Sequence, residues 1–326
     1  MPDPAPVLTK PFDFSQEFEL LVRAYEQSGG KPDVLRNSNF ASLAVHGNHV
    51  LGSKTVPGLH VETEEMPTGV RVRVVVEPEA RIPQPVHLCF GLIPQEGIQE
   101  IVSLFEIGDG AEVSFVAHCT FPNALRVRHV MDARIIVGRG AKMVYRETHY
   151  HGEQGGSEVL PKTRATVSAG GVLQSEFKLV KGTVGKLDLD FEAEVADKGI
   201  CEVAAKVYGK RQDKIVVRES LLLRGAGAKG LAKSRIAVTD QAHSEVLGEI
   251  VGEGPFSRGH VDCVEVIRGS EAMASAVPRL LVRHDTAKLT HEAAIGSVDK
   301  KQLETLMARG LTEEEATDVI VGGMLR

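Results

Sequence analysis

The sequence contains no tryptophan, few other aromatic residues and no long apolar run. Aromatic residues make up 5% of its 326 residues, whereas glycine occurs 33 times. A glycine-rich chain with mainly aliphatic apolar residues is typical of many short elements joined by tight turns. No apolar run approaches the ~20 residues that a membrane-spanning helix needs, and the first residues lack the apolar core of a signal peptide. We therefore expect a cytoplasmic protein without a membrane anchor.

Cysteine is also scarce, and acidic residues outnumber basic ones. The four cysteines, Cys89, Cys119, Cys201 and Cys263, form no C-x-x-C pair, and scattered thiols in a cytosolic protein are more often free than disulfide-bonded. The net charge of −6 disfavours binding to nucleic acid or to an anionic membrane. The GAGAKG stretch at 225–230 lacks the Lys-Ser/Thr ending of a phosphate-binding loop. Any ATP hydrolysis would therefore come from a partner subunit.

The middle of the chain repeats with a nearly constant period. Similar turn-like segments start at positions 110, 140, 170, 198 and 226, and the spacing between successive starts hardly varies. Self-similarity at a fixed period of this size is typical of stacked architectures, in which each strand pairs with the turns before and after it. We predict a mainly β fold with a parallel β-helix core over residues 108–296. A β-sandwich is the alternative, because sandwiches also consist of many short strands.

Helical patterns flank this core. Apolar residues at helical spacing predict a helix from Phe14 to about Tyr25, inside a small N-terminal α/β region that covers residues 1–107. At the other end, Asp299 can cap a helix over 300–309, and Thr312 forms a capping box for a second helix. The apolar residues of this C-terminal segment, 297–326, include Leu303, Leu306, Met307, Val319 and Ile320. The helical pair either packs on the last turn of the β-helix or docks a partner.

Two possible metal ligands lie one period apart near the end of the core. The separation between Cys263 and Glu292 matches the spacing of the repeated turns, and this match predicts equivalent positions on adjacent turns. Because stacked strands lie ~4.8 Å apart, the thiolate and the carboxylate would face each other. On a regular strand, His291 would point to the opposite face from Glu292. The competing interpretation is that Cys263 is a small buried hydrophobic residue, the usual role of a lone cysteine in a strand.

A second candidate site contains His149 and His151. Histidines at positions i and i+2 of a strand point to the same face, and with Glu153 or Glu158 they resemble the ligand set of cupin metalloenzymes. The spacing to either acid fits that set poorly. Three interpretations remain open: a cupin-like metal-dependent enzyme, an accessory metal site, and a surface strand without a metal.

The C-terminal sequence resembles the SufB/SufD family, and the stretch His87 to Gly91 is similar to its short archaeal-type members. The matching positions at the C-terminus are Cys263, Pro278, the TAKLTHEA run at 286–293, Gln302-Leu303, Arg309-Gly310-Leu311 and the EEEA run at 313–316. Two positions depart from the usual SufB pattern. Thr290 stands where SufB proteins commonly have Glu, and Ala272 replaces a second cysteine.

The resemblance implies a scaffold for iron–sulfur cluster assembly, not an enzyme, built on a right-handed parallel β-helix. It implies that a SufC-like ABC-type ATPase binds the C-terminal helices and that a second SufB/SufD-type subunit pairs with the chain. We expect a homodimer, since the chain looks like a short member without the N-terminal extension of bacterial SufB. A transient iron–sulfur cluster would form near Cys263, Glu292 and His291 at the subunit contact, before transfer to apo iron–sulfur proteins. Participation of a flavin stays open.

Overall fold

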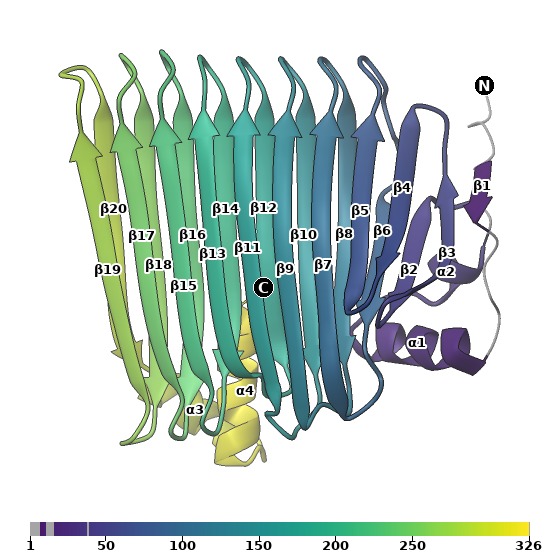
Figure 1. The fold of residues 1–326 in the computed structure, drawn as a ribbon. Helices are drawn as coiled ribbons and strands as arrows, with labels where there is room; N and C mark the ends of the chain where they lie inside the picture. The colour runs from purple at the N-terminus through teal and green to yellow at the C-terminus, as the bar shows by residue number, and fades with distance from the viewer. Residues whose placement is uncertain (1–6, 11–15, 38, 326) are drawn as a thin grey trace.

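The computed structural model describes residues 7–10, 16–37 and 39–325. In this part of the chain the fold is mainly β, a parallel β-solenoid of about eight turns with four helices (Figure 1). The core strands pair in parallel with strands of the preceding and following turns. The predicted β-helix is therefore confirmed, and the β-sandwich alternative is wrong. None of the described helices is long and apolar enough to cross a membrane.

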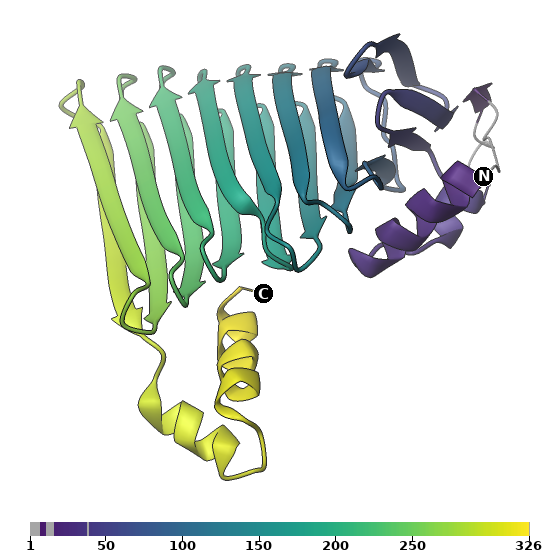
Figure 2. The same cartoon turned by 60° about the horizontal axis from the view of Figure 1, so that its bottom comes forward.

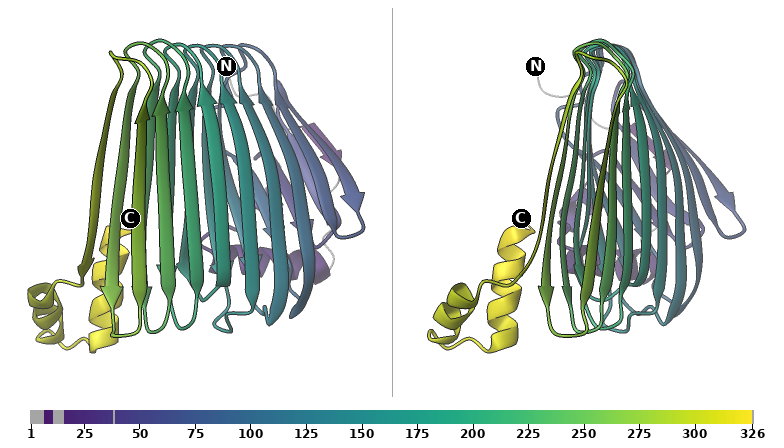
Figure 3. Two further views of the ribbon diagram at one scale, coloured as in Figure 1. Left: turned by 60° about the vertical axis from the view of Figure 1, so that its left-hand side comes forward. Right: turned by 90° about the vertical axis from the view of Figure 1, so that its left-hand side faces the viewer.

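Two sheets face each other along the stack (Figure 3). In spatial order, sheet A consists of β1 (Val7–Lys10), β3 (His49–Thr55), β2 (Ser42–His46), β6 (Val86–Gly91), β8 (Glu112–Phe121), β10 (Lys142–His151), β12 (Val172–Lys181), β14 (Ile200–Gly209), β16 (Lys229–Thr239), β18 (Arg258–Arg268) and β20 (Lys288–Ser297). Sheet B consists of β19 (Met273–Val282), β17 (His243–Gly252), β15 (Lys214–Leu223), β13 (Gly185–Val195), β11 (Ser157–Val167), β9 (Arg126–Val137), β7 (Glu96–Ile107), β5 (Gly69–Val76) and β4 (Leu59–Met66).

The repeat comes from one type of turn that recurs on successive rungs. Gly140 and Gly170 occupy it with φ values of 63° and 67°, in the left-handed region that glycine enters without steric cost. On later rungs the same position is taken by Lys198 (φ 55°) and Phe256 (φ 58°). A left-handed conformation costs a non-glycine residue roughly 1–2 kcal/mol. The left-handed turn is therefore present even on rungs where a residue other than glycine occupies it. Because successive rungs share the same turn, the period of the repeat is nearly constant.

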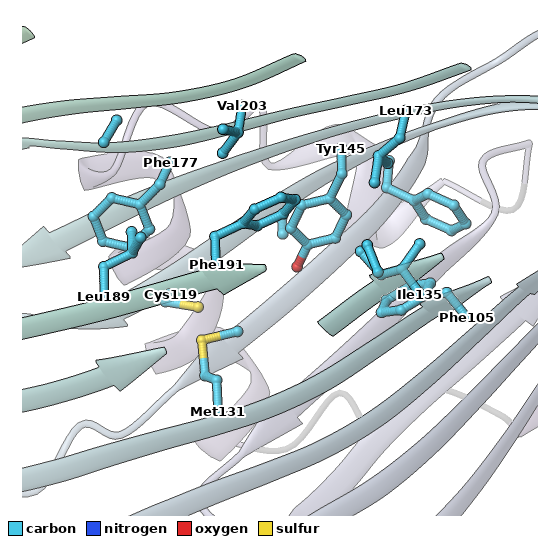
Figure 4. Packing of buried hydrophobic residues seen from close by; sticks show 14 of the residues in the cluster. Phe105, Cys119, Met131, Ile135, Tyr145, Leu173, Phe177, Leu189, Phe191 and Val203 are labelled. Carbon is cyan, nitrogen blue, oxygen red and sulfur yellow. The ribbon is translucent and has the colours of Figure 1, made fainter. Parts of the chain in front are cut away.

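The interior between the sheets is filled by the inward-pointing residues of each strand. Along β10, Met143, Tyr145, Glu147, His149 and His151 are buried and alternate with more exposed residues, as expected for a half-buried strand. Most of the inward-pointing residues are aliphatic or aromatic, and Figure 4 shows several of them between the sheets. Ionisable side chains are unusual in such surroundings. The ionisable side chains that lie between the sheets are therefore candidate functional groups.

The N-terminal end of the solenoid is covered. α1 (Gln16–Gln27) buries Phe18, Leu21 and Tyr25 in a cluster with residues of sheet A, while α2 (Asp33–Arg36) adds Val34 and Leu35. The antiparallel pairs β1–β3, β2–β3 and β4–β5 belong to the same end. The predicted helix start at Phe14 lies outside the described residues. Parallel pairing begins at β2–β6 and β5–β7, so both sheets run through the predicted boundary at residue 107.

The C-terminal end, in contrast, is open among the described residues. β20 and β19 are the last strands of sheets A and B, and each therefore presents an unpaired edge to solvent (Figure 1, left). Large apolar side chains on these two strands are exposed, including Met273 (61%), Val277 (47%) and Ile295 (45%). An exposed apolar surface beside unpaired strand edges is a typical site of association with another chain.

The two C-terminal helices have the predicted caps but a different packing. Asp299 accepts a hydrogen bond from the Gln302 backbone at the start of α3 (Lys300–Met307), and Thr312 forms the capping box of α4 (Glu313–Met324). α4 turns back along the flank of sheet A (Figure 2), where Val321 packs against Tyr208 of β14 and Ala237 of β16. The interpretation that this helical pair covers the last turn is therefore wrong.

Candidate functional site

The pairing of β18 with β20 decides how Cys263 and Glu292 lie relative to each other. Cys263 lies opposite Ala293, and Glu292 lies opposite Asp262. Because a shift of one residue reverses the direction of every side chain on a strand, Glu292 points to the outer face while Cys263 points into the solenoid. The predicted stacking of Cys263 on Glu292 is wrong. The interval between equivalent residues varies from turn to turn, so the sequence period does not fix the exact register.

His291 lies on the interior side of the last turn. It pairs with Val261, two residues before Cys263 and on the same face of β18. The His291 side chain is nevertheless exposed, because β20 has no further strand beyond it. His291 and Cys263 therefore lie on the same face of sheet A, although His291 belongs to the last turn. Glu292 lies on the opposite face of β20.

Cys263 lies in a buried polar cluster one turn below the open end. The residue is 1% exposed and lies opposite Ser234 of the preceding turn, whose hydroxyl donates a hydrogen bond of 3.2 Å to Glu219. Burial, with a smaller contribution from the Glu219 carboxylate, raises the pKa of the Cys263 thiol to about 12. Burial also raises the pKa of Glu219 to about 8. Near neutral pH, both groups are therefore mainly protonated.

A second buried carboxyl, Glu265, belongs to the same region. The Ser244 hydroxyl donates a hydrogen bond of 2.6 Å to Glu265, whose pKa is raised by burial. One carboxyl oxygen of Glu265 and one of Glu219 lack a hydrogen-bond partner. Sequence reasoning missed Glu219 and Glu265, although each occupies an inward position of an alternating strand. We call Cys263, Glu219, Glu265 and Ser234 the end cluster.

His149 and His151 are not on the surface. They are 1% and 0% exposed, so the interpretation as a surface strand is wrong, while the prediction that both point to one face is confirmed. Neither predicted acid is their partner: Glu153 is exposed, and Glu158 forms an ion pair with Lys186. Instead, His149 Nε2 lies 2.5 Å from a Glu147 carboxylate oxygen. His151 Nδ1 lies 2.9 Å from the Ser157 hydroxyl.

Two further residues, which sequence reasoning missed as ligands, surround His149. Cys119 lies directly opposite His149 in the pairing of β8 with β10, and His129 comes from β9 in the facing sheet. One potential ligand atom from each of Cys119, His129 and His149 lies within 4.8 Å of the others. We call these three residues the mid-stack cluster. Figure 4 shows the Cys119 sulfur among the buried side chains of the interior.

Burial shifts the pKa values of the mid-stack cluster away from the charged forms. Burial and the neighbouring Glu147 raise the pKa of the Cys119 thiol well above its usual value. Burial and His149 lower the pKa of His129. The Gln99 backbone counteracts this lowering of the His129 pKa, yet neither ring nitrogen of His129 makes a hydrogen bond of normal geometry.

A groove between α3 and α4 contains part of the predicted partner-binding set. Its lining includes Leu306, Val319 and Ile320. Val319 is 53% exposed and Met307 is 41% exposed, whereas Leu303 is half-buried. The two helices therefore bring three of the five predicted residues together along one surface.

The sequence model described as SUF system FeS cluster assembly, SufBD core domain, matches residues 95–324. The chain belongs to the SufBD family. An iron–sulfur cluster assembly SufBD family protein of Methanocaldococcus jannaschii is 35% identical over 311 residues, which cover 95% of this chain and 98% of that protein. A SufBD family protein of Pyrococcus horikoshii is 34% identical over 310 residues, which cover 95% and 94% of the two chains. The resemblance inferred from the C-terminal motifs is confirmed.

Longer SufBD proteins also match. A second SufBD family protein of Pyrococcus horikoshii is 29% identical over 257 residues, which cover 77% of this chain and 56% of that protein. The chain thus matches two archaeal relatives over nearly their whole length and this longer relative over little more than half.

Proposed function

We propose that this SufBD family member is a scaffold on which iron–sulfur clusters are assembled and from which they pass to apo-proteins. The observation that carries the proposal is the end cluster: a cysteine thiol and two buried carboxyl groups one to two turns from the open end of the solenoid, with His291 on the last turn. Cysteine thiolates hold iron–sulfur clusters. Carboxylate and imidazole ligands hold such a cluster less firmly, which suits a cluster that has to leave.

The end cluster can exchange protons for iron. Near neutral pH the thiol of Cys263 and the carboxyl of Glu219 are mainly protonated, because their pKa values are about 12 and about 8. These two groups therefore carry little charge before iron binds. Incoming iron would displace these protons, and the resulting thiolate and carboxylate would become ligands. Cluster loading would thus release protons, and acid would favour cluster loss.

A second copy of the chain is the partner that best fits the open end. The last turn exposes Val277, Ile295 and two unpaired strand edges, which another chain can cover by adding strands and apolar contacts. His291 and Glu292 lie on the same exposed edge strand. In a homodimer, Glu292 would act across the contact, because the register directs it away from Cys263 of its own chain.

The groove between α3 and α4 is the proposed docking site of a SufC-like ABC-type ATPase. Leu306, Val319 and Ile320 provide an apolar surface there, and α4 is attached to sheet A through Val321 and through the hydrogen bond of 2.8 Å from Tyr208 to Asp318. A partner that moves α4 would therefore act directly on β14 and β16. ATP hydrolysis belongs to that partner in this proposal.

The cupin-like enzyme alternative is less compatible with the structure. Its proposed ligands, His149 and His151, are 1% and 0% exposed, so a substrate cannot contact either imidazole unless the solenoid opens. This burial is more compatible with a non-enzymatic scaffold than with an active site that has to admit and release a small molecule.

Anaerobic reconstitution of the full-length chain with Fe²⁺ and sulfide tests the proposed function. We expect broad charge-transfer absorbance in the visible range and transfer of the cluster to an apo-ferredoxin. Retention of one tightly held metal together with turnover of a small molecule, without a transferable cluster, would contradict the scaffold proposal.

A further inference from the structure

The mid-stack cluster, Cys119, His129 and His149, is a second group of potential metal ligands inside the solenoid. We propose that these three residues hold a divalent first-row transition metal ion, Fe²⁺ or Zn²⁺, at a site separate from the end cluster. A thiolate and two imidazoles are the ligand types that these ions prefer in proteins. The inference stands on the described geometry and does not depend on the scaffold proposal.

The fold brings the three ligands together from three strands. Cys119 and His149 are direct neighbours in the pairing of β8 with β10, and His129 approaches from β9 of the other sheet. Their ligand atoms lie within 4.8 Å of one another. A tetrahedral metal with these ligand types separates its ligand atoms by about 3.5 Å. Small side-chain rotations would therefore close the group around an ion.

Unpartnered ring nitrogens provide an independent indication of a ligand. Nδ1 of His149 is buried without a hydrogen-bond partner. The Gln99 backbone lies near the His129 ring, but neither nitrogen of that ring makes a hydrogen bond of normal geometry. Buried polar atoms in native proteins nearly always have a partner, and a satisfied core histidine would show one. A metal ion bound between the rings would engage one nitrogen of each histidine, and the Cys119 sulfur would complete the three protein ligands.

The surroundings of His149 are those of a metal-bound imidazole. Its Nε2 lies 2.5 Å from a carboxylate oxygen of Glu147, which leaves Nδ1 for the metal. A carboxylate on the far nitrogen fixes the ring orientation and strengthens the imidazole as a ligand. The Cys119 thiolate and the Glu147 carboxylate together would carry two negative charges, which balance those of a divalent ion.

Aromatic rings pack against the mid-stack cluster. The ring centroid of Phe177 lies 4.6 Å from that of His149, and the centroid of Phe121 lies 4.7 Å from that of His129. A cavity of about 40 Å³, enough for a water molecule, borders Glu147 and Phe177 beside the cluster, and none of the three ligands lines it. A water that reached the ion from this cavity would be the fourth ligand of a tetrahedral site.

The mid-stack site is distant from the end cluster. From β8 to β18, sheet A advances by β10, β12, β14 and β16, and five steps of ~4.8 Å separate Cys119 from Cys263 by about 24 Å. Cys119 and His129 are 0% exposed. A metal held there would enter as the chain folds and would exchange slowly.

Co²⁺ is the probe for this site, because thiolate-to-Co²⁺ charge transfer reports a cysteine ligand directly. The full-length chain is expressed in Co²⁺-supplemented medium and purified without chelator. We expect one Co²⁺ per chain, with the charge-transfer band and the strong ligand-field bands of a tetrahedral site. In unsupplemented medium, metal analysis should find one zinc or iron ion per chain, and the metal found identifies the natural occupant.

Matched cysteine variants locate the bound ion. The charge-transfer band should disappear in Cys119→Ser and persist in Cys201→Ser and Cys263→Ser, which each remove another buried thiol. Glu147→Gln keeps the shape of the interior and should lower Co²⁺ affinity by about 10–100-fold in chelator competition. A parent chain without metal, a band lost in Cys263→Ser but kept in Cys119→Ser, or unchanged affinity in Glu147→Gln would overturn the proposal.

Discussion

Two buried cysteines of this chain, Cys119 and Cys263, occupy inward positions on strands of the same sheet but have different neighbours. Cys119 lies in the middle of the stack with His129 and His149, and every member of this group is at most 1% exposed. Cys263 is equally buried, yet only the last turn, β20, separates it from the open end. Its polar neighbours are Glu219, Ser234 and Glu265.

The difference between the two clusters lies in the ligands and in the route to solvent. Two imidazoles and a thiol in a closed interior suit an ion that stays bound. A thiol with carboxyl groups beside an uncovered edge suits cargo that enters and leaves. In the two proposals, the same β-solenoid holds a permanent ion in its middle and a transient cluster at its end, where partners would bind.

Deleting residues 298–326 should have the largest effect on partner binding and leave both thiol clusters intact. The deletion removes α3, α4 and the groove, whereas the sheets retain their pairing and expose Tyr208 and Ala237. We expect complete loss of binding to the ABC-type ATPase in a pull-down, while circular dichroism keeps its strand signal. Undiminished pull-down by the truncated chain would refute the proposed docking site.

A charged substitution on each of the last two strands should weaken the proposed contact between two copies at the open end and leave the middle of the stack unchanged. Val277→Asp with Ile295→Asp would place carboxylates in the proposed contact between two copies, where burying an unpaired charge is costly. We expect the dimer dissociation constant to rise by about 100-fold or more. Sedimentation measures the change.

Val102→Asp is the matched control for this double variant, because Val102 is a similarly exposed valine on β7, far from the open end. It should dimerise like the parent. Equal dimerisation of the control and the double variant would place the contact elsewhere.

Glu219→Gln should change how stability depends on pH. The pKa of Glu219 is about 8 in the folded state against a usual value of 4.5, so the folded state binds more protons than the unfolded state between these values. The free energy of unfolding of the parent should therefore fall as pH rises from 4.5 to 8, by on the order of a few kcal/mol. Glutamine cannot ionise, so the variant should lose this slope and be more stable than the parent above pH 8.

Urea unfolding at a series of pH values measures the Glu219 effect. His149→Gln offers a contrast, since it alters the mid-stack cluster and leaves Glu219 unchanged. A parallel pH dependence in the parent and in Glu219→Gln would show that Glu219 is not the buried acid responsible.

The sequence allowed the architecture and the helix caps to be predicted from local patterns. Turns that recur at a near-constant spacing indicated stacked strands, and Asp299 and Thr312 marked helix starts that the structure confirms. These features depend on neighbours in the sequence, so they can be recognised without knowing the packing of the two sheets.

The site was harder to predict because it depends on register and on contacts between sheets. Val172 pairs with Ile200 on one turn and Arg258 pairs with Lys288 on another. These two intervals differ in length, so a single period misplaced Glu292 by one position. Alternation along β8, β9 and β15 does place Cys119, His129 and Glu219 inside. It cannot show which inward residue of one sheet meets which residue of the other.

Anaerobic cluster reconstitution on Cys263→Ser beside Cys119→Ser tests the central difference between the two clusters most directly. Iron, sulfide and visible charge-transfer absorbance are measured per chain on folded protein, with Cys201→Ser as the control for loss of a buried thiol. We expect Cys263→Ser to form no cluster and Cys119→Ser to form as much as the control. A cluster that survives Cys263→Ser and is lost in Cys119→Ser would contradict the assignment of cluster assembly to the open end.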